Sequence, residues 1–141
     1  MKEIKGFQGE YRWLSNFWPV DIEYQGNVYP SVENAYQAAK FPKEERFPFV
    51  TCTAAVAKKL GSKKKNVDER WDGIKLFVMH ELNSKKYEDP VLKEKLKATG
   101  DAYIEETNNW GDTYWGVCNG EGKNYLGQIL MDIRNGLKWK P

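Results

Sequence analysis

The sequence predicts an α+β fold that is mainly helical, with a few short strands near the N-terminus. Apolar residues recur at helical spacing in several segments after residue 31, and residues typical of helix ends flank these segments. An alternating, strand-like pattern occurs only around residues 21–29. Since the 141 residues contain no linker, repeat or low-complexity tract, we expect one compact domain over residues 1–141.

The strand pair and the first helix are the earliest elements. Gln25 and Gly26 separate Asp21–Glu23 from Asn27–Tyr29, which predicts a tight turn between two short strands. Ser31 is a typical N-cap residue. The helix that it opens has an apolar stripe made of Val32, Ala35, Tyr36 and Ala39.

Two more helices are expected in the middle of the chain. Pro42 and Pro48 predict a loop after the first helix. Thr53 then opens a short helix that we expect to run to Leu60 and to end at Gly61. The next helix is expected from about residue 68 to residue 87, because apolar residues recur there at helical spacing.

The last two predicted helices have clear ends. Asp89 and Pro90 form an N-cap followed by proline at the first helical position, and Gly100 is a natural stop. In the final helix, Gly127 permits close packing against a neighbour. The apolar face of that helix is formed by Leu126, Ile129, Leu130, Ile133 and Leu137.

Composition excludes several classes of protein. The net charge of +2 argues against a broad nucleic-acid-binding face. No apolar run approaches the ~20 residues of a membrane helix, and residues 1–11 lack the apolar stretch of a signal peptide. Cys52 and Cys118 fit reduced thiols, so we expect a cytoplasmic protein.

A single histidine, His80, limits the possible metal chemistry. Sites that need several histidines cannot form, and no nucleotide-binding glycine motif is present. A site built from Cys52, His80 and Cys118 is conceivable, but these residues are scattered singly. We therefore expect a reaction without metal or cofactor, carried out by carboxylates, hydroxyls and amides.

Three polar residues share one face of the first helix. Glu33, Gln37 and Lys40 stand at positions i, i+4 and i+7, so a carboxylate, an amide and an ammonium group form one row. The row can face a polar ligand. Alternatively, Glu33 only complements the positive end of the helix dipole.

A second acidic candidate, Asp112, lies in the segment WGDTYWG at residues 110–116. Two Trp-Gly pairs bracket Asp112, which suits an ordered loop with close backbone approach. A solvated turn aspartate is the alternative. For Trp71, which starts the apolar stripe of the long helix, core packing is the alternative to a ligand contact.

Motifs along nearly the whole chain resemble one family. Each motif is weak alone, but their joint order and spacing are specific. The matching motifs are Phe7-Gln8-Gly9, Leu14-Ser15-Asn16-Phe17, residues 26–29, Ser31-Val32-Glu33, residues 36–41, Lys59-Leu60-Gly61, Trp71, Val78-Met79, residues 96–102, Glu105, Asp112, Tyr114-Trp115-Gly116, residues 122–127, Leu130-Met131 and Arg134. Together they resemble the YbiA-like, or NADAR, superfamily.

This resemblance implies a YbiA-like domain with N-glycosidase activity on ribosyl compounds. Similar members hydrolyse the N-glycosidic bond of early phosphoribosylated riboflavin intermediates, and other branches act on ADP-ribose, including ADP-ribosylated guanine in nucleic acid. The functional glutamate, tryptophan and aspartate of the family correspond to Glu33, Trp71 and Asp112.

The chemistry of these residue types fits that activity. Cleavage of a C1′–N bond develops positive charge on the ribose, which a carboxylate can stabilise, while a protonated carboxyl group can donate to the departing base. We hypothesise that Glu33 and Asp112 divide these roles and that Trp71 stacks on the heterocycle. Which carboxylate is the acid stays open.

Other residues are candidates for substrate binding. Lys40 and Arg134 are candidate phosphate contacts, with surface ion pairing as the alternative. Ser15 and Asn16 are candidate partners of ribose hydroxyls, or else caps of their own turn. Trp115 is the further aromatic candidate.

Three functions remain open from the sequence. The first is an N-glycosidase acting on a small phosphoribosylamino heterocycle, and the second is an ADP-ribosyl hydrolase acting on nucleotides or modified nucleic acid. The third is a non-catalytic nucleotide-binding module. The basic run at residues 63–65 favours the second, although such a run is more often an exposed loop. The near-neutral net charge and the compact length favour the first.

Overall fold

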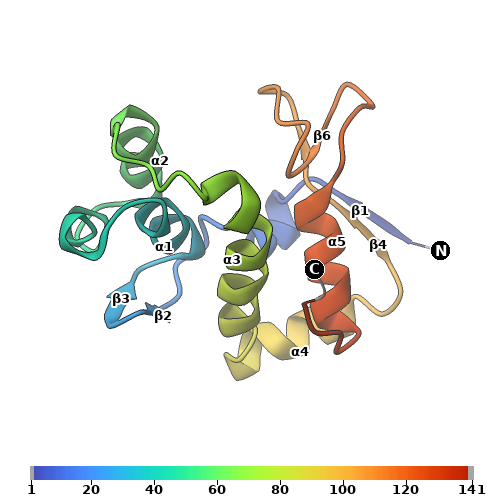
Figure 1. Ribbon diagram of the computed structural model, residues 1–141. Coiled ribbons are helices and arrows are strands. Elements are labelled where there is room, and N and C mark those ends of the chain that lie inside the picture. The colour runs from blue at the N-terminus through green and yellow to red at the C-terminus, as the bar shows by residue number, and fades with distance from the viewer. Residues whose placement is uncertain (1, 140–141) are drawn as a thin grey trace. The chain divides into compact units, whose positions relative to one another are not determined.

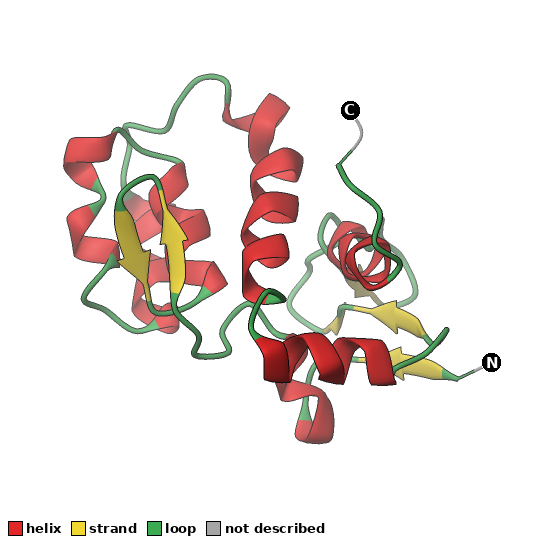
Figure 2. Ribbon diagram, turned by 90° about the horizontal axis from the view of Figure 1, so that it is seen from below, coloured by secondary structure: helices red, strands yellow, loops and turns green. Residues whose placement is uncertain are grey.

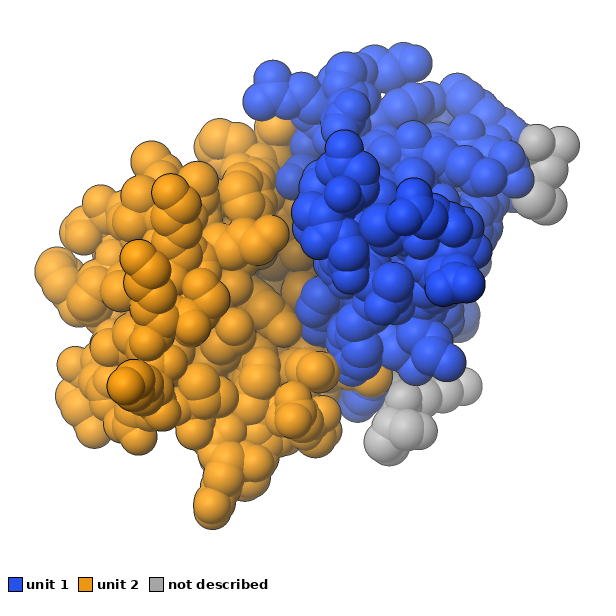
Figure 3. All heavy atoms as spheres, turned by 90° about the horizontal axis from the view of Figure 1, so that it is seen from above, with its two compact units in different colours: residues 1–15, 87–141 blue, residues 16–86 orange. Residues whose placement is uncertain are grey.

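The computed structural model describes residues 2–139, so the outermost residues of the predicted domain, 1 and 140–141, lie outside the described range. The chain divides into two compact units (Figure 3). Residues 1–15 and 87–141 form one unit, and residues 16–86 form the other. Both contain helices and short strands (Figure 1), which confirms a mainly helical α+β fold.

The unit of residues 16–86 is built around helix α1 (Val32–Ala39). The Ser31 side chain caps this helix as predicted, because its Oγ accepts a hydrogen bond from the Asn34 backbone N–H. Helices α2 (Ala54–Lys63) and α3 (Trp71–Lys86) pack against α1. All eight residues of α1 are buried, so its polar side chains lie inside the unit.

A short hairpin precedes α1 in the same unit. Strands β2 (Ile22–Tyr24) and β3 (Asn27–Tyr29) pair in antiparallel fashion, as Figure 2 shows. The two turn residues, Gln25 and Gly26, have φ angles of 48° and 95°. Positive φ at both central positions is the geometry that matches the twist of a two-residue hairpin. The predicted strand pair is thereby confirmed, with the first strand shifted by one residue.

Two predictions in this unit are wrong. Helix α2 does not stop at Gly61 but continues to Lys63. Gly61 is buried, and a Cβ at this position would overlap the Gln37 side chain, so the glycine allows α2 to approach α1 closely. The expected loop around Pro42 and Pro48 contains two short 3-10 helices, η2 (Lys43–Glu45) and η3 (Phe47–Phe49).

The other unit combines a parallel strand pair with two helices. Strand β1 (Glu3–Lys5) pairs with β4 (Tyr103–Glu105), and helix α5 (Tyr125–Arg134) packs against β4 (Figure 2). Gly127 permits this contact, because a Cβ there would collide with the Ile104 carbonyl oxygen. Helix α4 (Pro90–Ala98) has the predicted Asp89 cap, and the 3-10 helix η1 (Gly9–Leu14) follows β1.

The sequence pattern missed the strands after residue 100. Besides β4, strands β5 (Thr107–Asn108) and β6 (Val117–Cys118) form a parallel pair. Strands of two or three residues are too short to show an alternating pattern. The predicted apolar face of the last helix is also too long. Helix α5 ends at Arg134, and Leu137, which we expected on that face, is exposed.

Candidate functional site

Glu33 is a buried carboxylate in the first turn of α1. Only 8% of the residue is exposed, and its backbone N–H donates to the Asn16 carbonyl oxygen at 3.0 Å. The side chain accepts a hydrogen bond of 2.7 Å from Gln37 Nε2, one turn along the helix. Since carboxylates are rarely buried without partners, this arrangement is more than a solvated complement to the helix dipole.

Gln37 is held in place from the opposite side by α2. Its amide nitrogen must face Glu33, because the amide oxygen would repel the carboxylate. The amide oxygen Oε1 is buried and has no hydrogen-bond partner within the described residues. It lies where a side chain at Gly61 would be, so the absence of a Cβ at Gly61 gives Gln37 the room to reach Glu33.

Lys40 completes the predicted row at the end of α1. Its ammonium nitrogen lies 5.6 Å from the centre of the Tyr36 ring. Burial lowers the pKa of Lys40 below its usual range, and repulsion from Lys75 lowers it further, while attraction to Glu33 opposes the change. The carboxylate and the ammonium group therefore influence one another, as expected for groups on one helix face.

Trp71 begins α3 and is 7% exposed. Its ring lies 5.2 Å from that of Tyr36, at an interplanar angle of 59°. This burial agrees with the core-packing alternative for most of the ring, and stacking on a ligand stays a prediction. The Tyr36 ring nevertheless lies next to both Trp71 and the ammonium group of Lys40.

The two predicted ribose contacts belong to different units. Asn16 is buried, and its side chain donates to Met79 Sδ at 3.4 Å and accepts from Asn83 Nδ2 at 3.4 Å. Ser15 follows η1, and its backbone N–H donates to the Arg12 carbonyl oxygen. The unit of residues 16–86 thus brings together Asn16 and Glu33, whereas Ser15 belongs to the other unit.

Asp112 shapes the loop of residues 109–116. Its Oδ1 accepts hydrogen bonds from the backbone N–H groups of Tyr114, at 3.1 Å, and Trp115, at 2.9 Å. The Asn108 side chain bonds both backbone groups of Asp112. Within the described residues, Oδ2 of Asp112 has no hydrogen-bond partner, so the carboxylate is anchored through one oxygen and open at the other.

Trp115 and Arg134 have structural contacts in the same unit. The Trp115 ring meets Tyr114 edge to face, with centroids 4.8 Å apart. Arg134 Nη1 donates to the Ala102 carbonyl oxygen at 2.7 Å and to Thr99 Oγ1 at 3.1 Å, and burial lowers its pKa. Arg134 therefore ties α5 to the segment before β4, and its phosphate contact stays a prediction.

The remaining polar candidates show no metal-binding arrangement. Cys52 and Cys118 are free and half-buried. Among residues 2–139, no three side chains of His, Cys, Asp or Glu are grouped to hold a metal ion. In the basic run, Lys64 pairs with Glu45 at 3.2 Å, while Lys63 and Lys65 are exposed. Every helix in the described part of the chain is too short or too polar to span a bilayer.

Comparison with known proteins identifies the family. The NADAR domain model matches residues 5–138, which is nearly the whole chain and includes every candidate residue above. The chain belongs to the NADAR domain family. It is 34% identical to the N-glycosidase YbiA of Escherichia coli over an alignment of 136 residues that covers 91% of this chain and 82% of that protein.

Further similar proteins support this assignment. An N-glycosidase of Nostoc punctiforme is 32% identical over 91% of this chain and 86% of its own length. A riboflavin biosynthesis protein of Vibrio vulnificus is 34% identical over 89% of this chain but only 35% of its own length. The NMR structure of E. coli YbiA matches with a TM-score of 0.83 at 30% identity, covering 96% of this chain and 86% of that one. The chain is an N-glycosidase of the NADAR family.

Proposed function

We propose that this N-glycosidase hydrolyses the C1′–N bond of phosphoribosylamino heterocycles, such as early intermediates of riboflavin biosynthesis. The buried Glu33 carboxylate, oriented by Gln37, is the observation that carries the proposal. Relatives named as N-glycosidases and as riboflavin biosynthesis proteins support the reaction and the substrate class.

Glu33 is proposed to stabilise the positive charge that develops on the ribose as the C1′–N bond lengthens. Water then adds its oxygen to C1′, one of its protons is lost, and the departing nitrogen gains a proton. A carboxylate in a partly dry environment stabilises such charge more strongly than one in water. The hydrogen bond from Gln37 limits the rotation of Glu33, which favours a fixed position relative to C1′.

Asp112 is proposed as the second functional carboxylate. Its anchored Oδ1 fixes the orientation of the group, and the open Oδ2 can exchange a proton with water or with a leaving base. Lys40 is one proposed phosphate contact, in the row of Glu33, because an ammonium group binds phosphate as a point charge. For Trp71, only the small exposed part of the residue, 7%, is available to the heterocycle.

Incubation of the purified protein with defined substrates tests this proposal. Phosphoribosylamino-pyrimidine intermediates should yield ribose 5-phosphate and free base, and the Glu33→Gln variant should release both about 10²–10⁴ times more slowly. Release of ADP-ribose from ADP-ribosylated guanosine, with no cleavage of the pyrimidine, would instead support the ADP-ribosyl hydrolase. Binding of every compound without any cleavage would favour a non-catalytic module.

A further inference from the structure

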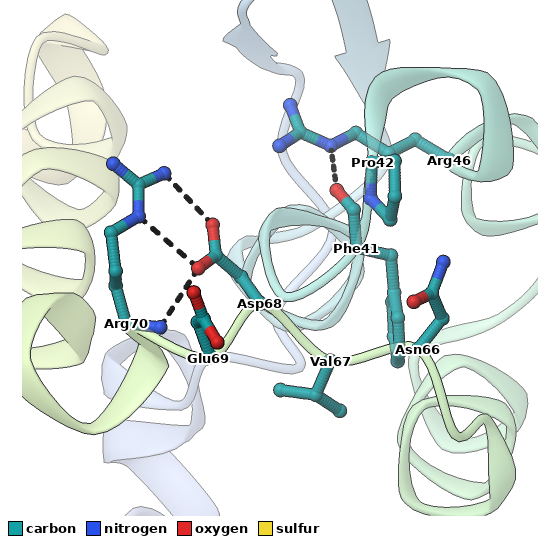
Figure 4. A pocket seen from close by; sticks show the side chains of 8 residues that line it. All are labelled: Phe41, Pro42, Arg46, Asn66, Val67, Asp68, Glu69 and Arg70. Carbon is teal, nitrogen blue, oxygen red and sulfur yellow. Dashed lines mark hydrogen bonds and ion pairs between the residues drawn. The ribbon is translucent and has the colours of Figure 1, made fainter.

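A cavity of about 500 Å³ lies in the unit of residues 16–86, after the end of α1 (Figure 4). This volume is in the range of pockets for small molecules. Polar and charged groups contribute most of its lining. The lining residues are Phe41, Pro42, Arg46, Asn66, Val67, Asp68, Glu69 and Arg70.

Arg46 is an unusual residue in this cavity, because it is a buried cation that forms no ion pair with any described residue. It is 8% exposed, and its Nε and Nη1 donate to the Phe41 carbonyl oxygen at 2.8 Å and to Gln25 Oε1 at 2.7 Å. Both acceptors are neutral, and so is the Tyr24 ring, 5.6 Å from the guanidinium carbon. Within the described residues, Arg46 forms no ion pair and its Nη2 has no hydrogen-bond partner.

Buried charges in proteins are normally paired or hydrogen-bonded at every donor. Arg46 meets this rule at Nε and Nη1 only. These two bonds fix the guanidinium plane, so the direction of the open Nη2 is also fixed. A rigid arginine with an open donor group is suited to an anion, and to phosphate in particular.

The acidic residues of the cavity do not supply that anion. Both oxygens of Asp68 accept hydrogen bonds from Arg70, at 2.8 and 3.2 Å for Oδ1 and at 2.9 Å for Oδ2. These bonds, with a smaller contribution from the positive charge of Arg46, hold the pKa of Asp68 at about 2, far below its usual value. Figure 4 shows the Asp68 carboxylate directed towards Arg70, with the Arg46 guanidinium across the cavity. Glu69, the other carboxylate, is exposed.

We infer that this cavity is a phosphate-binding site in which Arg46 is the principal contact. The cavity borders the candidate site through the backbone, because the Asp68 N–H donates to the Lys40 carbonyl oxygen at 2.8 Å and the Trp71 N–H donates to the Asp68 carbonyl oxygen at 2.9 Å. The bound group is either the phosphate of a phosphoribosyl compound or free phosphate. Binding does not depend on the proposed function, but assignment of the phosphate to the substrate rests on it.

Calorimetric titration of the full chain distinguishes the two sources. Ribose 5-phosphate, inorganic phosphate and unphosphorylated ribose are compared at one ionic strength. Tighter binding of ribose 5-phosphate than of inorganic phosphate assigns the site to a phosphoribosyl ligand, and equal affinity assigns it to free phosphate. Arg46→Gln should weaken both by about 10- to 100-fold, the effect of one lost charge-assisted contact. Glu69→Gln should strengthen binding, because it removes a competing negative charge.

The matched control is Arg12→Gln, which removes the same charge from an exposed arginine in the other unit. An equal loss of phosphate affinity in both arginine variants would show an effect of net charge alone and would overturn the inference. If Arg46→Gln does not fold, NMR spectroscopy of the parent protein provides the test instead. The side-chain Nε–H resonance of Arg46 should shift and saturate on addition of phosphate. No shift, or no binding of either phosphate compound, would overturn the inference, whereas failure to cleave substrates with phosphate still bound would overturn only the proposed function.

Discussion

The two candidate carboxylates are held in place in different ways. Glu33 is oriented by a side chain of its own helix, and the position of that side chain depends on the packing of α2 against α1. Asp112 is oriented by backbone N–H groups two and three residues later in its own loop. Disturbance of α2 should therefore affect the function of Glu33 from a distance, whereas Asp112 should respond mainly to changes in its own loop and at the neighbouring Asn108.

The largest effect is expected for Glu33→Gln. The substitution removes the charge but keeps the size and an oxygen that can accept from Gln37. We expect kcat to fall by about 10²–10⁴-fold, because a group that acts on the reacting atoms is lost. Steady-state kinetics and thermal unfolding should show a folded but slow enzyme. Glu44→Gln, at an exposed position in η2, is the matched control, and an equal loss there would contradict the role of Glu33.

Asp112→Asn and Asp112→Ala separate catalysis from loop structure. Asparagine retains an oxygen that can accept from Tyr114 and Trp115, so its stability should stay close to that of the parent. Alanine should lower the free energy of unfolding by about 1 kcal/mol through the lost backbone partners. Both variants should lose about 10²-fold or more in kcat. Near-normal turnover by Asp112→Asn would limit Asp112 to a structural role.

Gly61→Ala tests the long-range support of Glu33. The new methyl group overlaps Gln37, so we expect a loss of about 1–3 kcal/mol in unfolding free energy and a rate loss of about tenfold or more. Gly73→Ala is the matched control, because a Cβ there meets no atom within 4 Å, and alanine should stabilise α3 by up to about 1 kcal/mol. In a Gln37→Ala background, Gly61→Ala should add little to either loss. Full additivity would show that Gly61 acts without Gln37.

The smallest effect is a shift in pH dependence at Lys40. Because burial lowers the pKa of Lys40 below 10.5, the parent should lose activity as pH rises, starting below that value. Lys40→Arg keeps the charge at all working pH values, so this alkaline decline should move upward. Profiles of kcat/KM against pH for Lys40→Arg and for the exposed Lys65→Arg provide the comparison. Identical profiles for parent and Lys40→Arg would exclude Lys40 as the titrating group.

Local sequence signals predicted much of this fold. Ser31, Thr53 and Asp89 cap their helices as expected, since a cap depends on a few neighbouring residues. The Gln25–Gly26 turn was predicted for the same reason. The helical row of Glu33, Gln37 and Lys40 followed from spacing alone, although its burial did not.

Features that depend on tertiary packing escaped prediction. Gly61 has the sequence pattern of a helix stop, and only the neighbouring Gln37 shows why a glycine lies within α2. Arg46 stands among charged residues and gave no signal, because its burial depends on contacts with Gln25 and Phe41. For Trp71, the sequence left core packing and ligand contact open, and its contact with Tyr36 accounts for its burial.

The most direct test of the account is titration of the Glu33→Gln variant with an intact phosphoribosylamino heterocycle. If Glu33 acts on the reacting bond, its replacement should leave binding intact. The Glu33→Gln variant should then bind the uncleaved compound about as tightly as the parent protein binds its reaction product. Mass spectrometry should then recover the compound uncleaved. Release of ribose 5-phosphate at the parental rate, or loss of binding in a folded variant, would contradict the catalytic role of Glu33.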